Sequence, residues 1–92
     1  MIRSIRHKGL KRLFDAGDET GVQRSHSKKL RLILAAIDAS SSVQALDLPG
    51  FRLHALKGDQ QNRWSIRVNG NWRITFVFTD GDAWLLDYED YH

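Results

Sequence analysis

The hydrophobic period of this 92-residue chain changes at Gly50, and that change limits the possible folds more than any other feature of the sequence. Before Gly50, apolar residues recur three and four positions apart, as on one face of an α-helix. After it, they alternate with polar residues, as in half-buried β-strands. A chain of this length has room for one domain with one modest core. We therefore predict an α+β domain with two N-terminal helices packed on a mainly antiparallel sheet of four to five strands.

Two segments carry the helical pattern. The first is HKGLKRLFDAG, residues 7–17, and it ends at Gly17, a residue that commonly terminates helices in the left-handed conformation. The second is SHSKKLRLILAAIDAS, residues 25–40. Each has a single apolar stripe, as expected for a helix that packs on a core. The stripes consist of Leu10, Leu13 and Phe14 in the first segment, and of Leu30, Ile33, Leu34 and Ile37 in the second.

Five segments are expected to be strands. They are MIRSIRH (1–7), FRLHAL (51–56), RWSIRV (63–68), WRITFVF (72–78) and AWLLDY (83–88). The intervening NGN and TDGD are typical of tight hairpin turns. The alternation in the central strands predicts a core face that packs on the second helix. That face consists of Trp64, Ile66, Trp72, Ile74, Phe76 and Phe78, whereas Arg73, Thr75 and Val77 lie on the other side.

The charge of the chain is unevenly distributed. Residues 1–46 hold nine Lys/Arg and four Asp/Glu, a balance of +5, whereas residues 47–92 hold five and seven, a balance of −2. A basic half would suit a polyanion such as RNA, although a solvated helix face has the same composition. The residues expected to form the basic surface are Arg6, Lys8, Lys11, Arg12, Lys28, Lys29 and Arg31.

The composition also excludes several kinds of site. The chain has no cysteine, so neither disulfides nor thiolate zinc sites can support it, which favours a reducing cytoplasm. The basic start lacks the apolar run of a signal peptide, and LILAAI at residues 32–37 is too short to span a membrane. No phosphate-binding glycine loop or paired metal-ligand motif is present. We expect a cytoplasmic protein with no cofactor, metal or membrane contact.

The side chains capable of chemistry lie mostly in the second half. They are His54, Lys57, Arg73, Asp90, Tyr91 and His92, the last three in the segment DYEDYH. Each has an ordinary alternative interpretation: a hydrogen-bonded structural histidine, a surface ion-pair partner or a frayed terminus. The two histidines of the basic half, His7 and His26, are expected to be exposed polar residues.

Together these groups are compatible with metal-free cleavage of RNA by its own 2′-hydroxyl. Histidine can act as acid or base because its ordinary pKa is about 6.5. Arginine and lysine can stabilise the charge that a phosphate gains in the transition state. Tyrosine can donate a proton or stack on a base. DNA could not be the substrate because it lacks the nucleophile.

Three stretches resemble the HigB-type toxins of the RelE superfamily: FRLHALKGD, WSIRVNGNWRITFVFTDGDA and DYEDYH. IRHKGLKRLFDAG is similar to the N-terminal segment of those proteins, so the resemblance covers nearly the whole chain. It implies a single toxin domain over residues 1–92, belonging to a type II toxin–antitoxin module. It also implies an endoribonuclease that cleaves mRNA in the ribosomal A site without metal. Its partners would be the ribosome, mRNA and a cognate antitoxin with a DNA-binding helix-turn-helix.

By the same resemblance, the active-site positions are His54, Lys57, Arg73, Asp90, Tyr91 and His92. His54 and His92 would be base and acid in an unassigned order, and Tyr91 a further donor or stacking group. Lys57 and Arg73 would stabilise phosphate, and Asp90 would orient a partner. Ala55 stands where the family has proline, which removes no reactive group.

Two other functions remain open from the sequence. A toxin of the same fold that inhibits DNA gyrase would have no need of His54 and His92. A non-catalytic RNA-binding module would need only the basic first half.

Overall fold

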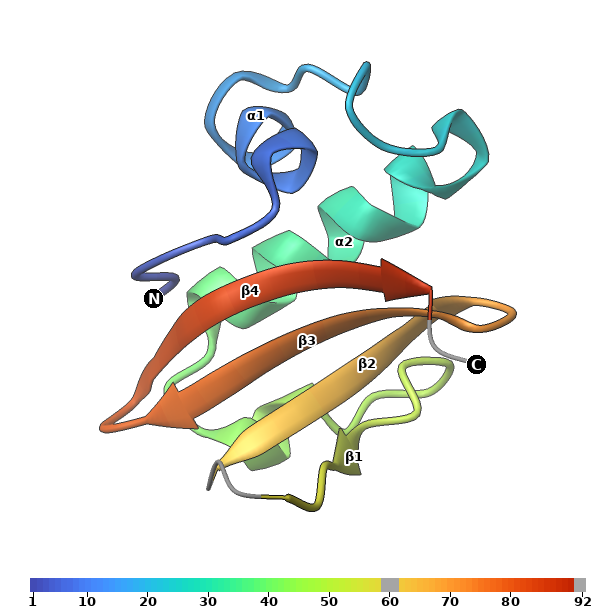
Figure 1. Ribbon diagram of the computed structural model, residues 1–92. Helices are drawn as coiled ribbons and strands as arrows, with labels where there is room; N and C mark the ends of the chain where they lie inside the picture. Colours follow the sequence, from blue (N-terminus) through green and yellow to red (C-terminus); the bar gives the residue numbers. More distant parts are fainter. Residues whose placement is uncertain (59–61, 91–92) are drawn as a thin grey trace.

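The computed structural model describes residues 1–58 and 62–90 (Figure 1). Two α-helices precede a four-stranded sheet, as the sequence predicts. The helices are α1 (Lys8–Ala16) and α2 (Ser27–Ala39), with short 3₁₀ turns η1 (Arg24–His26) and η2 (Val43–Leu46). The strands are β1 (His54–Ala55), β2 (Arg63–Asn69), β3 (Trp72–Thr79) and β4 (Asp82–Asp90).

The sheet is antiparallel throughout, and its strand order follows the chain from β1 to β4. Both predicted hairpin turns are present. The turn between β3 and β4 has Asp80 and Gly81 at φ 52° and 79°, and positive φ at both central residues matches the twist of an antiparallel pair. Both α-helices lie on one side of the sheet (Figure 1), which leaves the other side for the site.

The segment predicted as a first strand is not a regular strand. Residues 1–6 run along the outer edge of β4 and form two isolated parallel bridges, Ile2 with Ala83 and Ile5 with Leu86. Between these bridges, β4 carries an irregularity at Leu85, whose φ of 56° lies in the left-handed region. The edge of β4 is therefore bent where a continuous parallel ladder would need it straight, and the ladder is interrupted.

The strand predicted over residues 51–56 is also shorter, because only His54 and Ala55 form β1. Arg52 has φ 48°, which no regular strand residue adopts, so the chain turns between Phe51 and His54. The segment nevertheless stays beside β2, since the amide of Arg67 donates to the carbonyl of Phe51 at 2.8 Å. His54 is thus held at the edge of the sheet by a turn rather than by a long strand.

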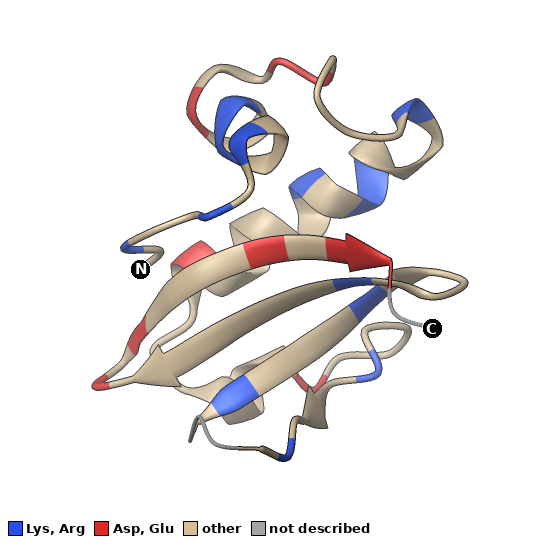
Figure 2. Ribbon diagram, in the orientation of Figure 1, with Lys and Arg blue, Asp and Glu red and all other residues tan. Residues whose placement is uncertain are grey.

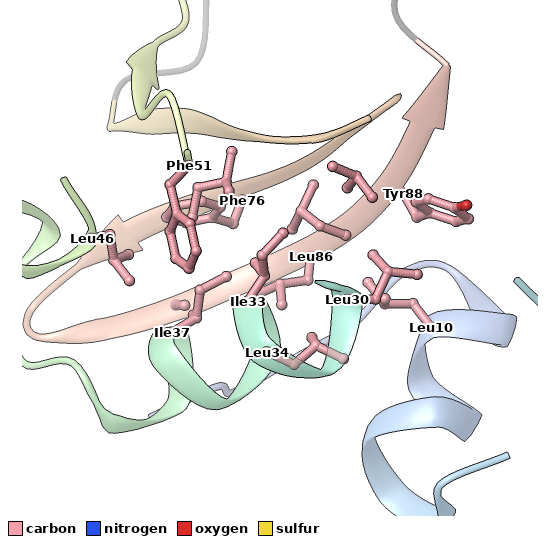
Figure 3. Close-up of a cluster of buried hydrophobic side chains, with 14 of the residues drawn as sticks. Leu10, Leu30, Ile33, Leu34, Ile37, Leu46, Phe51, Phe76, Leu86 and Tyr88 are labelled. Carbon is pink, nitrogen blue, oxygen red and sulfur yellow. The ribbon is translucent and has the colours of Figure 1, made fainter. Parts of the chain in front are cut away.

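The core lies between α2 and the sheet (Figure 3). The predicted stripe of α2 is entirely buried, and so are Ile66, Ile74, Phe76 and Phe78. Trp64 and Trp72 are only partly buried against this cluster. The structure adds residues that the sequence analysis did not assign to the core on this face: Leu46, Phe51, Leu86 and Tyr88.

Truncation of Phe76 to alanine is expected to cost about 3–5 kcal/mol of unfolding free energy, because the side chain is buried and its loss leaves a cavity. Phe76 is 1% exposed, at the centre of the sheet. Urea unfolding followed by circular dichroism would measure the change. Leu32→Ala is the matched control: Leu32 is 59% exposed on α2, so its truncation should change stability by no more than about 0.5 kcal/mol. Equal losses in the two variants would contradict this assignment of the core.

Candidate functional site

The side of the sheet opposite the helices presents a polar surface, which we call the outer face. Paired residues of neighbouring strands project to the same side, so the register fixes its members. One row across the sheet holds His54, Ser65, Thr75 and Asp87. A second row holds Arg67, Arg73 and Glu89, and a third holds Arg63, Val77 and Trp84. Figure 2 shows the cationic segments of β2 and β3 beside the acidic segments of β4.

A pocket with a volume of about 380 Å³ opens on this face. It is lined by Arg52, His54, Leu56, Ser65 and Arg73. The structure therefore brings together two of the predicted site residues, His54 and Arg73, which lie 19 positions apart in the sequence. His54 arrives from β1 and Arg73 from β3, with the small side chain of Ser65 between them on β2.

The guanidinium of Arg73 is the most unusual polar group of the pocket. Its Nη1 is buried and has no hydrogen-bond partner within residues 1–58 and 62–90. A buried donor without a partner costs about 1–3 kcal/mol. Arg67 lies directly across from Arg73 on β2, and like charges placed opposite one another repel. An anion in the pocket would relieve both costs, so the arrangement suits a phosphate.

Glu89 lies on the other side of Arg73, across the β3–β4 pair. Its Oε2 accepts a hydrogen bond from Thr75 Oγ1 at 2.5 Å and forms an ion pair with Arg63 Nη2 at 3.5 Å. These two contacts hold the carboxylate on the outer face. The sequence analysis did not identify Glu89, Thr75, Ser65 or Arg52 as site residues. The alternation of β2 and β3 gave a signal for two of them, because Ser65 and Thr75 share a face with Arg73.

Of the four remaining predicted site residues, the structure describes Lys57 and Asp90. Lys57 is exposed after β1 and does not line the pocket. Asp90 is the last residue of β4, which extends two residues beyond the predicted end at Tyr88, and it pairs with Trp72. Tyr91 and His92 lie outside the described residues. The geometry thus places His54 and Arg73 in one pocket, and the roles of all six residues stay predictions.

The two histidines of the basic half have structural contacts. The prediction that His26 is exposed is wrong: it is 4% exposed, and its Nδ1 shares a hydrogen bond with Tyr88 Oη at 2.5 Å. Burial lowers the pKa of His26 and raises that of Tyr88, so both stay neutral near pH 7. His7 is half-buried and caps α1, where its Nδ1 accepts from the amide of Leu10 at 3.1 Å. Both imidazoles pack against aromatic rings at the helix–sheet junction, His7 against Tyr88 and His26 against Trp72. This packing explains their burial, which the polar residue type alone did not predict.

Of the seven basic residues predicted to form one surface, four have a partner in the described chain and three do not. Lys11, Arg12 and Arg31 form ion pairs with Asp15, Asp18 and Glu19, at 2.7, 3.7 and 3.2 Å. Lys29 Nζ donates to the carbonyl of Gly50 at 2.9 Å. Arg6, Lys8 and Lys28 are exposed and form no ion pair with a carboxylate of the described chain. Carboxylates therefore interrupt the basic surface.

Among the described residues, no three His, Asp or Glu side chains come together as a set of metal ligands. No helix in this part of the chain is long and apolar enough to cross a membrane.

Comparison with known proteins gives a family match and a similar named protein, each over nearly the whole chain. A family model described as HigB-like toxin, "RelE-like toxin of type II toxin-antitoxin system HigB", matches residues 3–92. The protein named Endoribonuclease HigB from Proteus vulgaris is 48% identical to the chain over 92 residues, which is 100% of both sequences.

Proposed function

Because the chain belongs to the HigB-like family of RelE-type toxins of type II toxin–antitoxin systems, we propose that it is an endoribonuclease that cleaves mRNA in the ribosomal A site. A toxin of this type has a cognate antitoxin that neutralises it. We expect that antitoxin to carry a DNA-binding helix-turn-helix. The 48% identity to a protein named endoribonuclease, over the full length of both chains, supports the nuclease over a gyrase inhibitor or a passive RNA-binding module.

The observation that carries the proposal is the pocket that holds His54 together with a guanidinium nitrogen of Arg73 that has no partner among the described residues. A proton carrier beside a cation is the minimum that phosphodiester cleavage by a neighbouring hydroxyl requires. Simple RNA binding would use cations, but it would not need an imidazole in the same pocket as a buried, unsatisfied donor.

The proposed reaction uses the nucleophile of the substrate. A base removes the proton of the 2′-hydroxyl, and the oxygen attacks the adjacent phosphorus. The bond to the 5′-oxygen then breaks while an acid protonates that oxygen, which yields a 2′,3′-cyclic phosphate and a free 5′-hydroxyl. His54 and His92 are the base and acid in an order still to be assigned, and Arg73 stabilises the phosphorane charge. Lys57, Tyr91 and Asp90 would supply a second cation, a further donor or stacking ring, and an orienting carboxylate.

Induced expression followed by mapping of mRNA 5′ ends would test this function. New 5′-hydroxyl ends should appear inside translated reading frames and disappear when translation initiation is blocked. The Arg73→Ala variant provides the control for cleavage by host enzymes. New ends that are independent of translation would contradict the ribosomal site. Loss of DNA supercoiling without new mRNA ends would support the gyrase alternative.

The basic surface is proposed to contact ribosomal RNA, and the three cations that form no ion pair with the described carboxylates should dominate that contact. Neutralising Arg6, Lys8 and Lys28 with glutamine should weaken ribosome binding and reduce its salt dependence, because fewer counterions are released. Each lost phosphate contact lowers the slope of log K against log salt by about 0.7–0.9, so the triple variant should lose about two. Binding measured over a series of salt concentrations gives the slope.

A second triple variant is the matched control for this measurement. Lys11, Arg12 and Arg31 have the same charge but are paired with carboxylates, so their neutralisation should change the slope less. Equal slopes for the parent and the first variant would place the ribosome contact elsewhere.

A further inference from the structure

The strand β4 contains a bulge that changes the face on which Trp84 lies. Strict alternation along AWLLDY would place Trp84 on the core face with Leu86 and Tyr88. In the structure, the register between β3 and β4 shifts between Thr75 and Val77, so that two residues of β4 lie opposite Phe76. Beyond the bulge, Ala83 is buried on the core face, and Trp84 pairs with Val77 on the outer face.

The bulge has a conformational cost. Leu85 occupies it with φ 56°, a conformation that costs a non-glycine residue about 1–2 kcal/mol. The result is a tryptophan that is 40% exposed on a polar surface. Bulges near functional sites commonly redirect a side chain, and strained backbone is often retained for function. A bound ligand would explain why the bulge places the indole of Trp84 on this surface.

The indole of Trp84 has no partner in the described part of the chain. It makes no ring contact and no hydrogen bond with those residues. The other two tryptophans differ in this respect. Trp72 packs on the ring of Tyr88, with centroids 4.5 Å apart, and Trp64 packs against the core cluster. Trp84 is the one tryptophan of the three that is exposed, whereas Trp64 and Trp72 are partly buried.

The surroundings of Trp84 connect it to the pocket. It lies in one row of the outer face with Val77 and Arg63. At the end of that row, the amide of Leu56 donates to the carbonyl of Arg63 at 2.8 Å, and Leu56 lines the pocket. The next row, with Ser65, is two residues away along β2, or about 7 Å. Trp84 lies on β4, two strands beyond β2 or about another 10 Å across the sheet, so a chain leaving the pocket along the outer face would reach it after crossing β3.

The charge of this surface favours an anionic ligand over an apolar or basic protein segment. The outer face and the pocket together hold four cations, Arg52, Arg63, Arg67 and Arg73, against three anions, Asp82, Asp87 and Glu89. Asp82, at the start of β4, is already paired with the N-terminal amine and with Arg3. Arginines interleaved with an unpaired aromatic ring are the usual features of a surface that binds single-stranded nucleic acid.

We propose that Trp84 is a stacking platform for an unpaired RNA base of the strand whose phosphate occupies the His54–Arg73 pocket. This inference rests on the proposed function, because it takes RNA as the ligand of that pocket. Stacking on an indole accepts any base, so the platform would strengthen binding and fix the path of the strand without selecting a sequence. The bulge at Leu85 is the device that places the ring on this face.

Binding of a fluorescently labelled, fully 2′-O-methylated single-stranded oligonucleotide would test the platform. The probe keeps its bases and phosphates but has no nucleophile, so it cannot be cleaved. Stacking is worth about 1–3 kcal/mol per base, so Trp84→Leu should weaken binding roughly 5- to 150-fold. Trp84→Phe keeps an aromatic face and should bind within a few-fold of the parent. Leu32→Ala, an exposed apolar truncation on α2, should not change the affinity.

Probes with a single abasic nucleotide would locate the stacked base. At one position, the abasic probe should bind the parent and Trp84→Leu equally, because the interaction has already been removed. The proposal is overturned if Trp84→Leu binds as tightly as the parent, or if the parent does not bind the probe. It is also overturned if Trp84→Leu weakens only the complex with the antitoxin, which would make the ring part of a protein interface.

Cleavage is measured separately, so the two proposals can fail independently. An effect of Trp84→Leu on probe binding, without new mRNA ends in cells, would leave the platform standing and remove the nuclease. New mRNA ends in cells, together with equal probe affinities for the parent and Trp84→Leu, would support the nuclease and remove the platform.

Discussion

Alanine in place of Arg73 is expected to slow the cleavage of ribosome-bound mRNA by about 10²–10³-fold, the usual cost of removing a preorganised group that stabilises transition-state charge. The guanidinium cannot give up its proton at ordinary pH, so its contribution is electrostatic alone. The residual activity should therefore keep the pH dependence of the parent. Single-turnover cleavage across a range of pH, with chemistry shown to be rate-limiting, would measure both properties.

Stability separates this functional role from a structural one. Arg73 keeps a buried nitrogen without a described partner and lies opposite Arg67. Its removal is therefore expected to leave the unfolding free energy unchanged or to raise it. Arg67→Ala is the matched control, since it removes a cation from the same row but outside the pocket lining, and it should slow cleavage much less. Equal rate losses in the two variants would show that only the total charge of the face matters.

The hydrophobic period was sufficient to predict the layers of this fold. The stripe of α2 and the alternation of β2 and β3 predicted which residues meet in the core, and Gly17, at φ 70°, ends α1 as expected. The resemblance to HigB-type toxins is confirmed by the family model over residues 3–92. These features depend on local patterns, which the sequence displays directly.

The errors lie where the backbone leaves its regular period. Arg52 and Leu85 have positive φ, although neither is a glycine that would have marked the position. The first shortens β1, and the second interrupts the contact of residues 1–6 with β4. His26 was assigned by residue type, whereas its burial depends on Tyr88, 62 positions away. Such contacts depend on strand register and long-range packing, which a single sequence does not contain.

The same reasoning explains how much of the candidate site could be predicted. His54 and Arg73 were identified by resemblance, and their convergence in one pocket required the register of three strands. Glu89 was overlooked because its role comes from Thr75 and Arg63 on two other strands. A residue whose importance lies in its cross-strand neighbours cannot be recognised from its own position in the sequence.

Glutamine in place of His54 is expected to slow cleavage by about 10²–10⁴-fold, the usual contribution of one general acid or base. Glutamine keeps a hydrogen-bonding side chain but cannot exchange a proton near neutral pH. The variant should therefore lose one limb of the pH–rate profile. His92→Gln should lose the other limb, if the two histidines divide the proton transfers as proposed. Single-turnover cleavage of ribosome-bound mRNA as a function of pH is again the measurement.

The identity of the lost limb assigns the roles. A base must be deprotonated to act, so its removal abolishes the rise in rate on the acidic side, whereas removal of the acid abolishes the fall on the alkaline side. His7→Asn is the control: asparagine also caps a helix, and His7 lies at the start of α1 outside the pocket lining, so both limbs should remain. If His54→Gln and His92→Gln each keep both limbs and nearly the full rate, neither histidine carries the proton, and Tyr91 would be the next residue to test.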